Sequence, residues 1–364
     1  MQLSDLRTVL RQMLLLLVSF FALSCVLLGV SLLVLPPPDR NAPIDTFRAG
    51  STVYTTPPRL IYYGRKGLRA DGEKVILLGS SNTQVGFDRQ TLADRIDGLA
   101  VHNLGIGDAN ITEIAQVSDL ATASIGQDNL EGQVFVIGIW YATFIDNANR
   151  WSSGDAQVFE TDIDQERFRY GFQRMGANGL EGWISDRDAD YAAIAVHPLI
   201  ALEKAIRIVT ADLRSMIFVR PPRIDTETRN TMIYSDTQKS EALEYRRRYM
   251  KSDQLSDEQY AVLDALVRDL TDQGAQVIVA DLPIPAWHAQ GLPFNSDHKV
   301  RIAQTRADLA GVKGFTYLDL RNLDDPDSFY DDAHVRPRDQ GPWVDELAKL
   351  IQTITRTRNT LASN

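Results

Sequence analysis

A serine, a histidine and an aspartate in this chain have the types and positions that nucleophilic catalysis needs. Ser81 comes shortly after the apolar run 75–78, where Gly79 allows a buried strand to end in a tight turn. His334 lies three residues after Asp331, in a loop before the last helical segment. In a turn, this spacing lets the carboxylate accept a hydrogen bond from one ring nitrogen while the other nitrogen faces a nucleophile. Two serines stand there, Ser80 and Ser81, and the pattern predicts a serine nucleophile with His334 as the base and Asp331 as its partner.

Other chemistries that begin with a strand and a glycine turn lack their motifs. The chain has no G-x-G-x-x-G after this strand, no G-x-x-x-x-G-K-[ST] and no G-x-S-x-G. No group of histidines, cysteines and carboxylates has the spacing of metal ligands. The sequence therefore predicts neither a nucleotide nor another cofactor, and no metal.

Five strand-like runs provide the frame that must position these residues. They are separated by segments long enough for helices, which predicts an α/β domain with a mainly parallel sheet and helices on both faces. In such sheets the carboxyl ends of the strands share one edge, where ligands bind. Ser81 follows the first run, and Asp331 and His334 follow the last. The runs are residues 74–78, 99–104, 133–138, 276–281 and 315–320.

Two helices have clear boundaries in the sequence. Residues 256–259 form a capping-box pattern, and the helix that they open should end near Gly274. The last helix should open around Pro342. Between the third run and the capped helix, residues 140–255 are too many for a loop, so they predict a helical insertion that covers the strand ends, helical chiefly over 189–219 and 238–251. The alternative is a peripheral subdomain with no functional role.

Three short blocks resemble the SGNH, or GDSL-type, hydrolase and acyltransferase superfamily. Gly79-Ser80-Ser81 is similar to its first block, usually Gly-Asp-Ser, with Ser80 in the aspartate position. Residues 103–108, Asn-Leu-Gly-Ile-Gly-Asp, resemble the second block, and Asp331-x-x-His334 resembles the last. The resemblance covers residues 74–140 and 274–357. It implies a flavodoxin-like three-layer sandwich, with Ser81 as the nucleophile.

The same resemblance implies an oxyanion hole. Its donors would be the amides of Ser81 and Gly107, with Gly105 as the second choice for the glycine. The third block is normally Gly-x-Asn, whose asparagine completes the hole, but here the strand ends in Gly138-Ile-Trp140. Asn82 or Asn147 are candidates to replace this donor. Loss of one oxyanion donor costs on the order of 100- to 1,000-fold in rate, so either the donor comes from elsewhere or the activity is slow.

Aromatic residues follow the third run at the predicted ligand edge. Trp140, Tyr141 and Phe144 could stack on a sugar ring, and ordinary packing under the insertion is the alternative. His288 follows the fourth run, and we interpret it as a structural or solvated histidine rather than a second site residue.

An uncharged stretch at the N-terminus predicts a transmembrane helix over residues 13–35. As a helix it would span about 35 Å, enough for the core of a bilayer. Arg7 and Arg11 precede it, so the positive-inside rule places residues 1–12 in the cytoplasm and the rest of the chain outside. A cleaved signal peptide is the rival interpretation, and Cys25, the single cysteine, is a weak candidate for lipidation.

The rest of the chain divides by composition. Prolines and polar residues over 36–58 predict a stalk, residues 59–357 the folded domain, and 358–364 a polar tail. With 48 acidic and 38 basic residues the net charge is −10, which argues against a nucleic-acid partner. The only local basic run, residues 246–248, is interpreted as the solvated face of a helix.

An anchored SGNH-like domain resembles the envelope proteins of bacteria that transfer acyl groups. The likeness is to the alginate O-acetylation proteins and to the D-alanyl-transfer proteins of lipoteichoic acid synthesis. It implies a single-pass protein of the bacterial inner membrane whose domain faces the periplasm or the cell exterior, and a multipass membrane-bound O-acyltransferase as partner. The expected function is serine-dependent O-acyl transfer, with acetyl favoured, to a cell-envelope or secreted polysaccharide. The alternatives are a carbohydrate esterase or deacetylase, and an inactive scaffold or glycan-binding protein of this fold.

Overall fold

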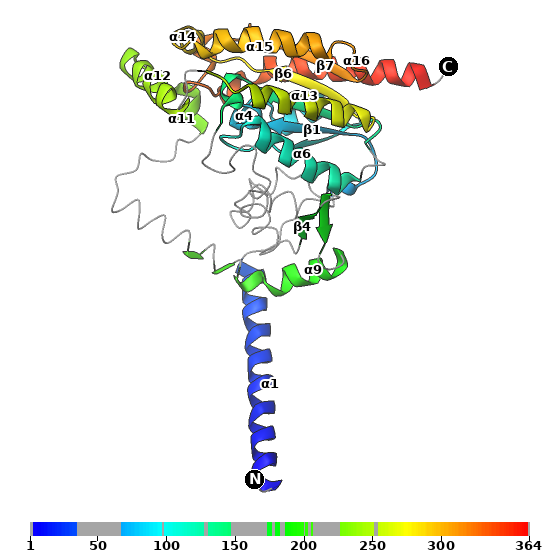
Figure 1. Ribbon diagram of the computed structural model, residues 1–364. Coiled ribbons are helices and arrows are strands. Elements are labelled where there is room, and N and C mark those ends of the chain that lie inside the picture. The colour runs from blue at the N-terminus through cyan, green and yellow to red at the C-terminus, as the bar shows by residue number, and fades with distance from the viewer. Residues whose placement is uncertain are drawn as a thin grey trace.

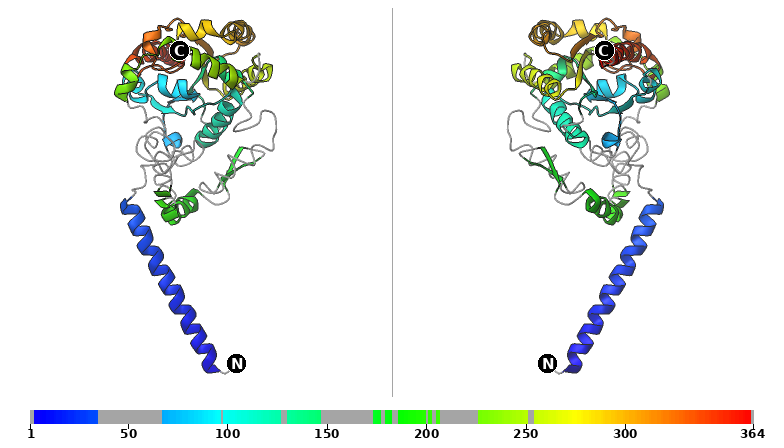
Figure 2. Two further views of the ribbon diagram at one scale, coloured as in Figure 1. Left: turned by 90° about the vertical axis from the view of Figure 1, so that its left-hand side faces the viewer. Right: turned by 90° about the vertical axis from the view of Figure 1, so that its right-hand side faces the viewer.

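The protein contains an α/β domain and a long N-terminal helix, as the computed structural model shows (Figures 1 and 2). The predicted stalk, residues 36–58, lies outside the described residues. The structure describes residues 3–34, 67–96, 98–126, 130–146, 173–176, 179–182, 186–199, 201–202, 205–206, 226–250 and 254–362.

Five parallel strands form the sheet of the domain, in the order β2-β1-β3-β6-β7. All five strand-like runs are confirmed to within one or two residues at each end. Numbered along the chain, the order is 2-1-3-4-5, the flavodoxin-like arrangement, and its direction reverses between β1 and β3, where ligands bind in such sheets. The strands are β1 (Lys74–Gly79), β2 (Ala100–Asn103), β3 (Val134–Ile139), β6 (Gln276–Asp281) and β7 (Phe315–Asp319).

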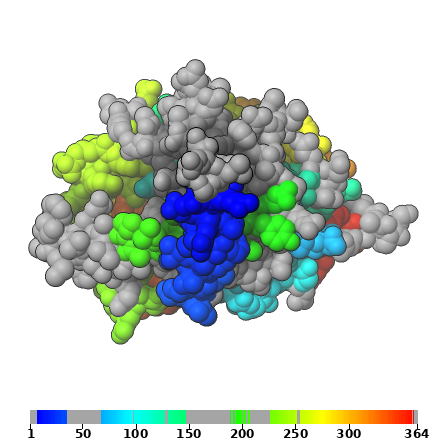
Figure 3. All heavy atoms as spheres, turned by 90° about the horizontal axis from the view of Figure 1, so that it is seen from below, coloured from blue at the N-terminus to red at the C-terminus, as the bar shows by residue number. Residues whose placement is uncertain are grey.

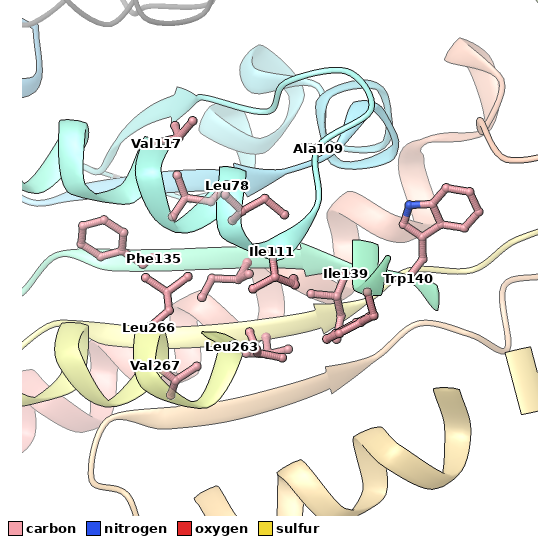
Figure 4. Close-up of a cluster of buried hydrophobic side chains, with 14 of the residues drawn as sticks. Leu78, Ala109, Ile111, Val117, Phe135, Ile139, Trp140, Leu263, Leu266 and Val267 are labelled. Atoms are coloured by element: carbon pink, nitrogen blue, oxygen red, sulfur yellow. The ribbon is translucent and has the colours of Figure 1, made fainter. Parts of the chain in front are cut away.

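Alternate residues of the central strands pack into two separate apolar clusters, one on each face of the sheet. Val75 and Leu77 pack with α5 (Arg89–Arg95) and α16 (Gly341–Ala362). Ile76 and Leu78 face α6 (Ile111–Ile125) and α13 (Asp257–Asp272), the cluster drawn in Figure 4. Because both faces are covered, the central parts of β1, β3 and β6 are apolar and buried, and the domain has the predicted three layers.

The helix predicted to begin at residues 256–259 forms as α13, but the predicted capping box at its start is absent. Ser256 occupies the N-cap position of α13, but its side chain makes no capping hydrogen bond. Gln259 instead accepts from the amide of Thr112 at 3.0 Å, and so joins α13 to α6. The predicted capping box is therefore wrong, because a tertiary partner takes its glutamine. The helix ends at Asp272, and Gly274 follows with φ of +91°, as a C-terminal glycine should.

The last helix, α16, begins at Gly341 and ends at Ala362. It begins beside the predicted Pro342, and its buried residues Trp343, Val344, Leu347 and Ile351 belong to the apolar cluster on one face of the sheet. The helix continues into residues 358–362, so this part of the predicted tail is helical.

The described parts of the insertion are both helical and extended. Its helices include α9, which overlaps the start of the predicted 189–219 region, and α12, which matches 238–251. The antiparallel hairpin β4–β5 was not predicted. The elements are η2 (Tyr141–Phe144), β4 (Gln173–Gly176), β5 (Gly179–Gly182), α9 (Asp186–Ala195), α11 (Thr226–Thr231) and α12 (Asp236–Met250).

The N-terminal helix α1 (Leu3–Val34) projects away from the domain (Figure 2). Among the described residues it is the one helix long and apolar enough to cross a membrane, over the 28 residues Arg7–Val34. Its most apolar stretch is not buried in the protein. These properties fit a single-pass anchor and a signal sequence equally, and Cys25 on this helix is exposed.

Candidate active site

Two glycines bring Ser81 to the point where the strand order reverses. Gly79 ends β1 with φ of +151°, and Gly138 is its neighbour in β3. A Cβ on either residue would lie about 2 Å from the Thr83 hydroxyl, at 2.0 and 2.1 Å. Their missing side chains therefore let the short helix α4 (Ser81–Gly86) pack against the ends of both strands, with Ser81 as its first residue.

Asp331 and His334 lie in a loop that closes on itself. Phe329 and Val335 form an isolated antiparallel bridge, and the amide of Tyr330 donates to the carbonyl of His334 at 3.0 Å. Within this loop the Asp331 Oδ1 atom accepts from the amides of Ala333 at 2.8 Å and His334 at 2.7 Å. These two hydrogen bonds stabilise the turn, and the turn places the His334 imidazole beside the other oxygen of the same carboxylate.

His334 joins the serine to the aspartate through its two ring nitrogens. Its Nδ1 lies 2.7 Å from Asp331 Oδ2, and its Nε2 lies 2.8 Å from Ser81 Oγ. An ionised carboxylate only accepts, so Nδ1 carries the hydrogen and Nε2 is left to accept from the serine hydroxyl. The predicted serine, histidine and aspartate are thus in hydrogen-bond contact, in the arrangement that activates a hydroxyl nucleophile.

The surroundings of Asp331 keep it ionised. Burial alone would raise the pKa of this carboxyl, but the hydrogen bond and charge of His334, with two backbone amides, hold the pKa below its usual value. An ionised Asp331 stabilises the imidazolium that forms when His334 takes the serine proton.

Asn82 tethers the loop to the nucleophile helix. The loop leaves β7 at the sheet edge and must cross the ends of β6 and β3, about 14 Å, to reach β1. The Asn82 side chain is buried at 1% exposure and donates to the carbonyl of Ala333 at 2.9 Å. Its amide is directed to the loop, so the structure gives no support to Asn82 as an oxyanion donor. Asn147, the other candidate, lies outside the described residues.

The two candidate glycines after β2 differ in their surroundings. The Gly105 amide already donates to Asn103 Oδ1 at 3.1 Å, which disfavours it as an oxyanion donor. The next amide, of Ile106, donates to the carbonyl of Gly79 at 2.9 Å and holds the loop beside the end of β1. Gly107 follows, is partly exposed, and faces open space where a Cβ would stand. Its role as an oxyanion donor beside the Ser81 amide stays a prediction.

The aromatic residues after β3 are buried rather than open to a sugar. Trp140 and Tyr141 are 5% and 1% exposed, and the ring of Phe144 stacks on Tyr260 with centroids 3.9 Å apart. Trp140 lies at the carboxyl end of β3 (Figure 4), and its indole N–H donates to Ser80 Oγ at 3.2 Å. The rings of Trp140 and Tyr141 therefore have no exposed face on which a sugar could stack. Their burial fits the alternative, ordinary packing.

His288 belongs to a buried network behind the loop. The Asp332 carbonyl accepts from its Nδ1, so its Nε2 must accept from the Tyr141 hydroxyl, 2.6 Å away. Burial lowers the pKa of His288, which keeps the ring neutral. This histidine is structural, one of the two roles that the sequence left open for it.

Arg246 is the principal residue that sequence reasoning missed. Its guanidinium pairs with Asp332, with Nε 2.5 Å from Oδ2, and lies 5.1 Å above the Trp140 ring. Arg246 is 9% exposed, so the solvated-face interpretation is wrong for it, although it fits the exposed Arg247 and Arg248. Its partner is 86 positions away, and no local pattern signals the pair.

A second arginine joins the same loop to α11. Arg336 is 3% exposed and donates to three carbonyls, those of Asp327 at 2.7 Å, Arg229 at 2.9 Å and Met232 at 2.6 Å. Two helices of the insertion, α11 and α12, thus hold the loop that carries Asp331 and His334. This observation argues against an insertion without a role.

Partly exposed rings beside Asp331 were also not marked by the sequence. Tyr234 and Trp287 line a pocket of about 60 Å³, together with Lys239 and Asp331. Burial raises the pKa of Tyr234 to about 12, assisted by the charges of Asp331 and Asp332.

Among the described residues, no group of three or more histidines, cysteines and carboxylates could hold a metal ion.

Replacing Arg246 with methionine should lower the free energy of unfolding by about 3 to 5 kcal/mol, because it leaves the Asp332 carboxylate, only 13% exposed, without its arginine partner. Thermal unfolding of the full chain followed by tryptophan fluorescence measures the loss. The double variant Arg246→Met, Asp332→Asn should recover a large part of it. Arg247→Met, at the exposed neighbour, is the matched control and should change stability by less than about 0.5 kcal/mol. Equal effects at the two positions would show that the ion pair does not hold the loop.

No family model matches this chain, and a search of curated proteins finds no match to it. The likeness to the SGNH superfamily therefore stands on the short blocks and on the geometry of Ser81, His334 and Asp331. At the level of architecture, the chain has an α/β domain with an all-parallel five-stranded sheet.

Proposed function

We propose that the protein is a membrane-anchored serine O-acyltransferase that acts on an extracytoplasmic polysaccharide. The observation that carries the catalytic part is the position of the His334 ring, 2.8 Å from Ser81 Oγ and 2.7 Å from Asp331 Oδ2. The apolar helix α1 supports the anchored, extracytoplasmic placement, and the resemblance to bacterial envelope acyltransferases supports the acceptor class.

The proposed reaction has two steps. Ser81 Oγ attacks the acyl carbonyl while His334 Nε2 takes the hydroxyl proton, and the amides of Ser81 and Gly107 bind the oxyanion. The tetrahedral intermediate then releases the donor's leaving group, which receives the proton from His334, and an acyl-serine ester remains. In the second step a sugar hydroxyl gives its proton to His334 and attacks the ester carbonyl. The bond to Ser81 Oγ then breaks, His334 returns the proton to this oxygen, and the O-acyl sugar leaves.

The same groups would serve a carbohydrate esterase if water took the place of the sugar hydroxyl. We favour transfer because the anchor holds the domain where a multipass O-acyltransferase could deliver acyl groups across the membrane. With two backbone amides and no asparagine in the third block, the first step should be slow with small esters.

The test uses the full chain in detergent, with 4-nitrophenyl acetate as donor and neutral and uronate-containing oligosaccharides as acceptors. Mass spectrometry of the Ser81 peptide should find one added acetyl group, and acceptor should speed its release and yield an acetylated sugar. Release into water alone, unchanged by any acceptor, would assign the esterase. A folded protein that never acetylates Ser81 would leave the scaffold or glycan-binding alternative.

A further inference from the structure

Large apolar side chains are exposed in one segment outside the sheet domain, residues 186–206. This segment contains α9 and the short helical pieces that follow it. Other large apolar side chains exposed outside α1 in the described part of the chain, Ile233, Tyr245 and Val300, are scattered. The apolar residues of the segment are Tyr191, Ile194, Leu199, Leu202 and Ile206, with exposures of 60, 43, 64, 57 and 54%. Gathered in one segment, such side chains indicate a binding surface.

The segment lies against the C-terminal end of α1. His197 Nδ1 is 3.0 Å from the hydroxyl of Ser31, and both residues are nearly fully buried, at 3% and 6% exposure. Figure 1 shows α9 lying across the upper end of α1, and Figure 3, seen along that helix from below, shows parts of the segment in green on both sides of it.

The contact between Ser31 and His197 shows where the segment lies along the axis of α1, the helix that could cross a membrane. Ser31 lies three residues before Val34, the last described residue of α1, a rise of about 4.5 Å. Leu33 and Val34 are 84% and 77% exposed beyond it. A bilayer that α1 crosses would therefore reach the level of His197. Amphipathic helices at a membrane surface bury their apolar face about 5–10 Å into the boundary between headgroups and acyl chains, which matches this level.

We propose that the described residues of this segment, 186–199, 201–202 and 205–206, form an interfacial element at the membrane surface where the C-terminal end of α1 emerges. Leu199, Leu202 and Ile206 would contact lipid there. The occupant of this apolar surface is the bilayer, because the Ser31–His197 contact joins the surface directly to the helix that would span it. The domain then has two attachments to the membrane, a span and a surface element. Two attachments restrict its tilt and its height above the bilayer far more than a single helix does.

The proposal is tested on the full chain in phosphatidylcholine nanodiscs. Cys25→Ser removes the single cysteine, and Leu199→Cys or Leu202→Cys then accepts an environment-sensitive fluorophore at a position already exposed. Doxyl groups near the headgroup end of the acyl chains should quench these labels several-fold more than a label at Val300→Cys, which is 72% exposed on α15 (Phe294–Leu309). A label at Val18→Cys, exposed within the apolar helix, reports whether α1 is in the bilayer.

Each outcome decides the question. Strong quenching at residues 199 and 202 with little at residue 300 supports the interfacial element. Quenching at residue 18 alone overturns it while leaving the anchor intact, and energy transfer between labels at residue 199 of two chains would then identify a second copy as the occupant. No quenching at residue 18 shows that α1 does not insert, and the proposal falls with the anchor. None of these readouts depends on catalysis, so they are independent of the proposed acyl transfer.

Discussion

Replacing Ser81 with alanine should lower kcat for ester turnover by a factor on the order of 10⁴ to 10⁶, as removal of a nucleophile does in serine hydrolases. The variant lacks the oxygen that His334 Nε2 contacts at 2.8 Å, so no acyl-enzyme can form. Initial rates with 4-nitrophenyl acetate and the mass of the Ser81 peptide measure the two effects together. The fold should persist, because the serine hydroxyl is at the partly exposed start of α4.

Ser80→Ala is the matched control, since it removes a hydroxyl one residue away. Ser80 Oγ accepts from the Trp140 indole and is 3% exposed, so its loss should cost about 1 kcal/mol of stability and leave kcat within a few-fold. Two results would contradict Ser81 as the nucleophile. One is a kcat of Ser81→Ala equal to that of the parent, and the other is a similar loss of kcat in Ser81→Ala and Ser80→Ala.

Replacing Asp331 with asparagine should lower kcat by a factor on the order of 10⁴. The asparagine oxygen can still accept from the amides of Ala333 and His334, which preserves the loop. Its NH₂ group then faces His334 Nδ1 and can only donate, so the imidazole hydrogen moves to Nε2. That nitrogen becomes a donor toward Ser81 and cannot take its proton. The rate with 4-nitrophenyl acetate should fall while KM changes little.

Asp327→Asn is the control for Asp331→Asn, because Asp327 lies in the same connection and is exposed. It should leave kcat unchanged. A rate for Asp331→Asn close to that of the parent would mean that the carboxylate does not set the histidine tautomer.

The Tm of the parent and the Tm of Asp331→Asn should depend differently on pH in acid. The pKa of Asp331 is lower in the folded chain than in the unfolded one, so its ionisation stabilises the fold at pH values above about 4. This contribution is lost as the pH falls through the folded pKa. The Tm difference between the parent and Asp331→Asn should be constant above about pH 5 and should shrink below pH 4. A Tm difference that stays constant throughout would contradict a lowered pKa.

Features with a local cause could be predicted from the sequence. The buried strands are read from continuous apolar runs, because both faces of a parallel sheet are covered. The edge shared by Ser81, Gly107 and His334 follows from the order of the elements alone. The spacing of Asp331 and His334 is also local, since one turn holds both side chains.

Features that depend on tertiary partners could not be predicted. Arg246 looks like its neighbours Arg247 and Arg248 until Asp332, far along the chain, is placed beside it. Gln259 has the spacing of a capping box but bonds to Thr112 in another helix. Trp140 follows the strand at the expected edge, and only the packing around it shows that its ring is covered. In each case the competing partner is distant in sequence, where periodicity carries no information.

The contact between Ser81 and His334 joins positions 253 residues apart. Contacts of such long sequence separation form late, because most of the chain must be ordered before the loop that carries the partner can dock. During synthesis from the N-terminus, the serine is made long before the histidine and stays an ordinary, weakly nucleophilic hydroxyl. A chain that ended at residue 330 would contain the serine and all five strands of the sheet but no base. The protein thus acquires its reactive group only after Asp331 and His334 have been made and their loop has docked.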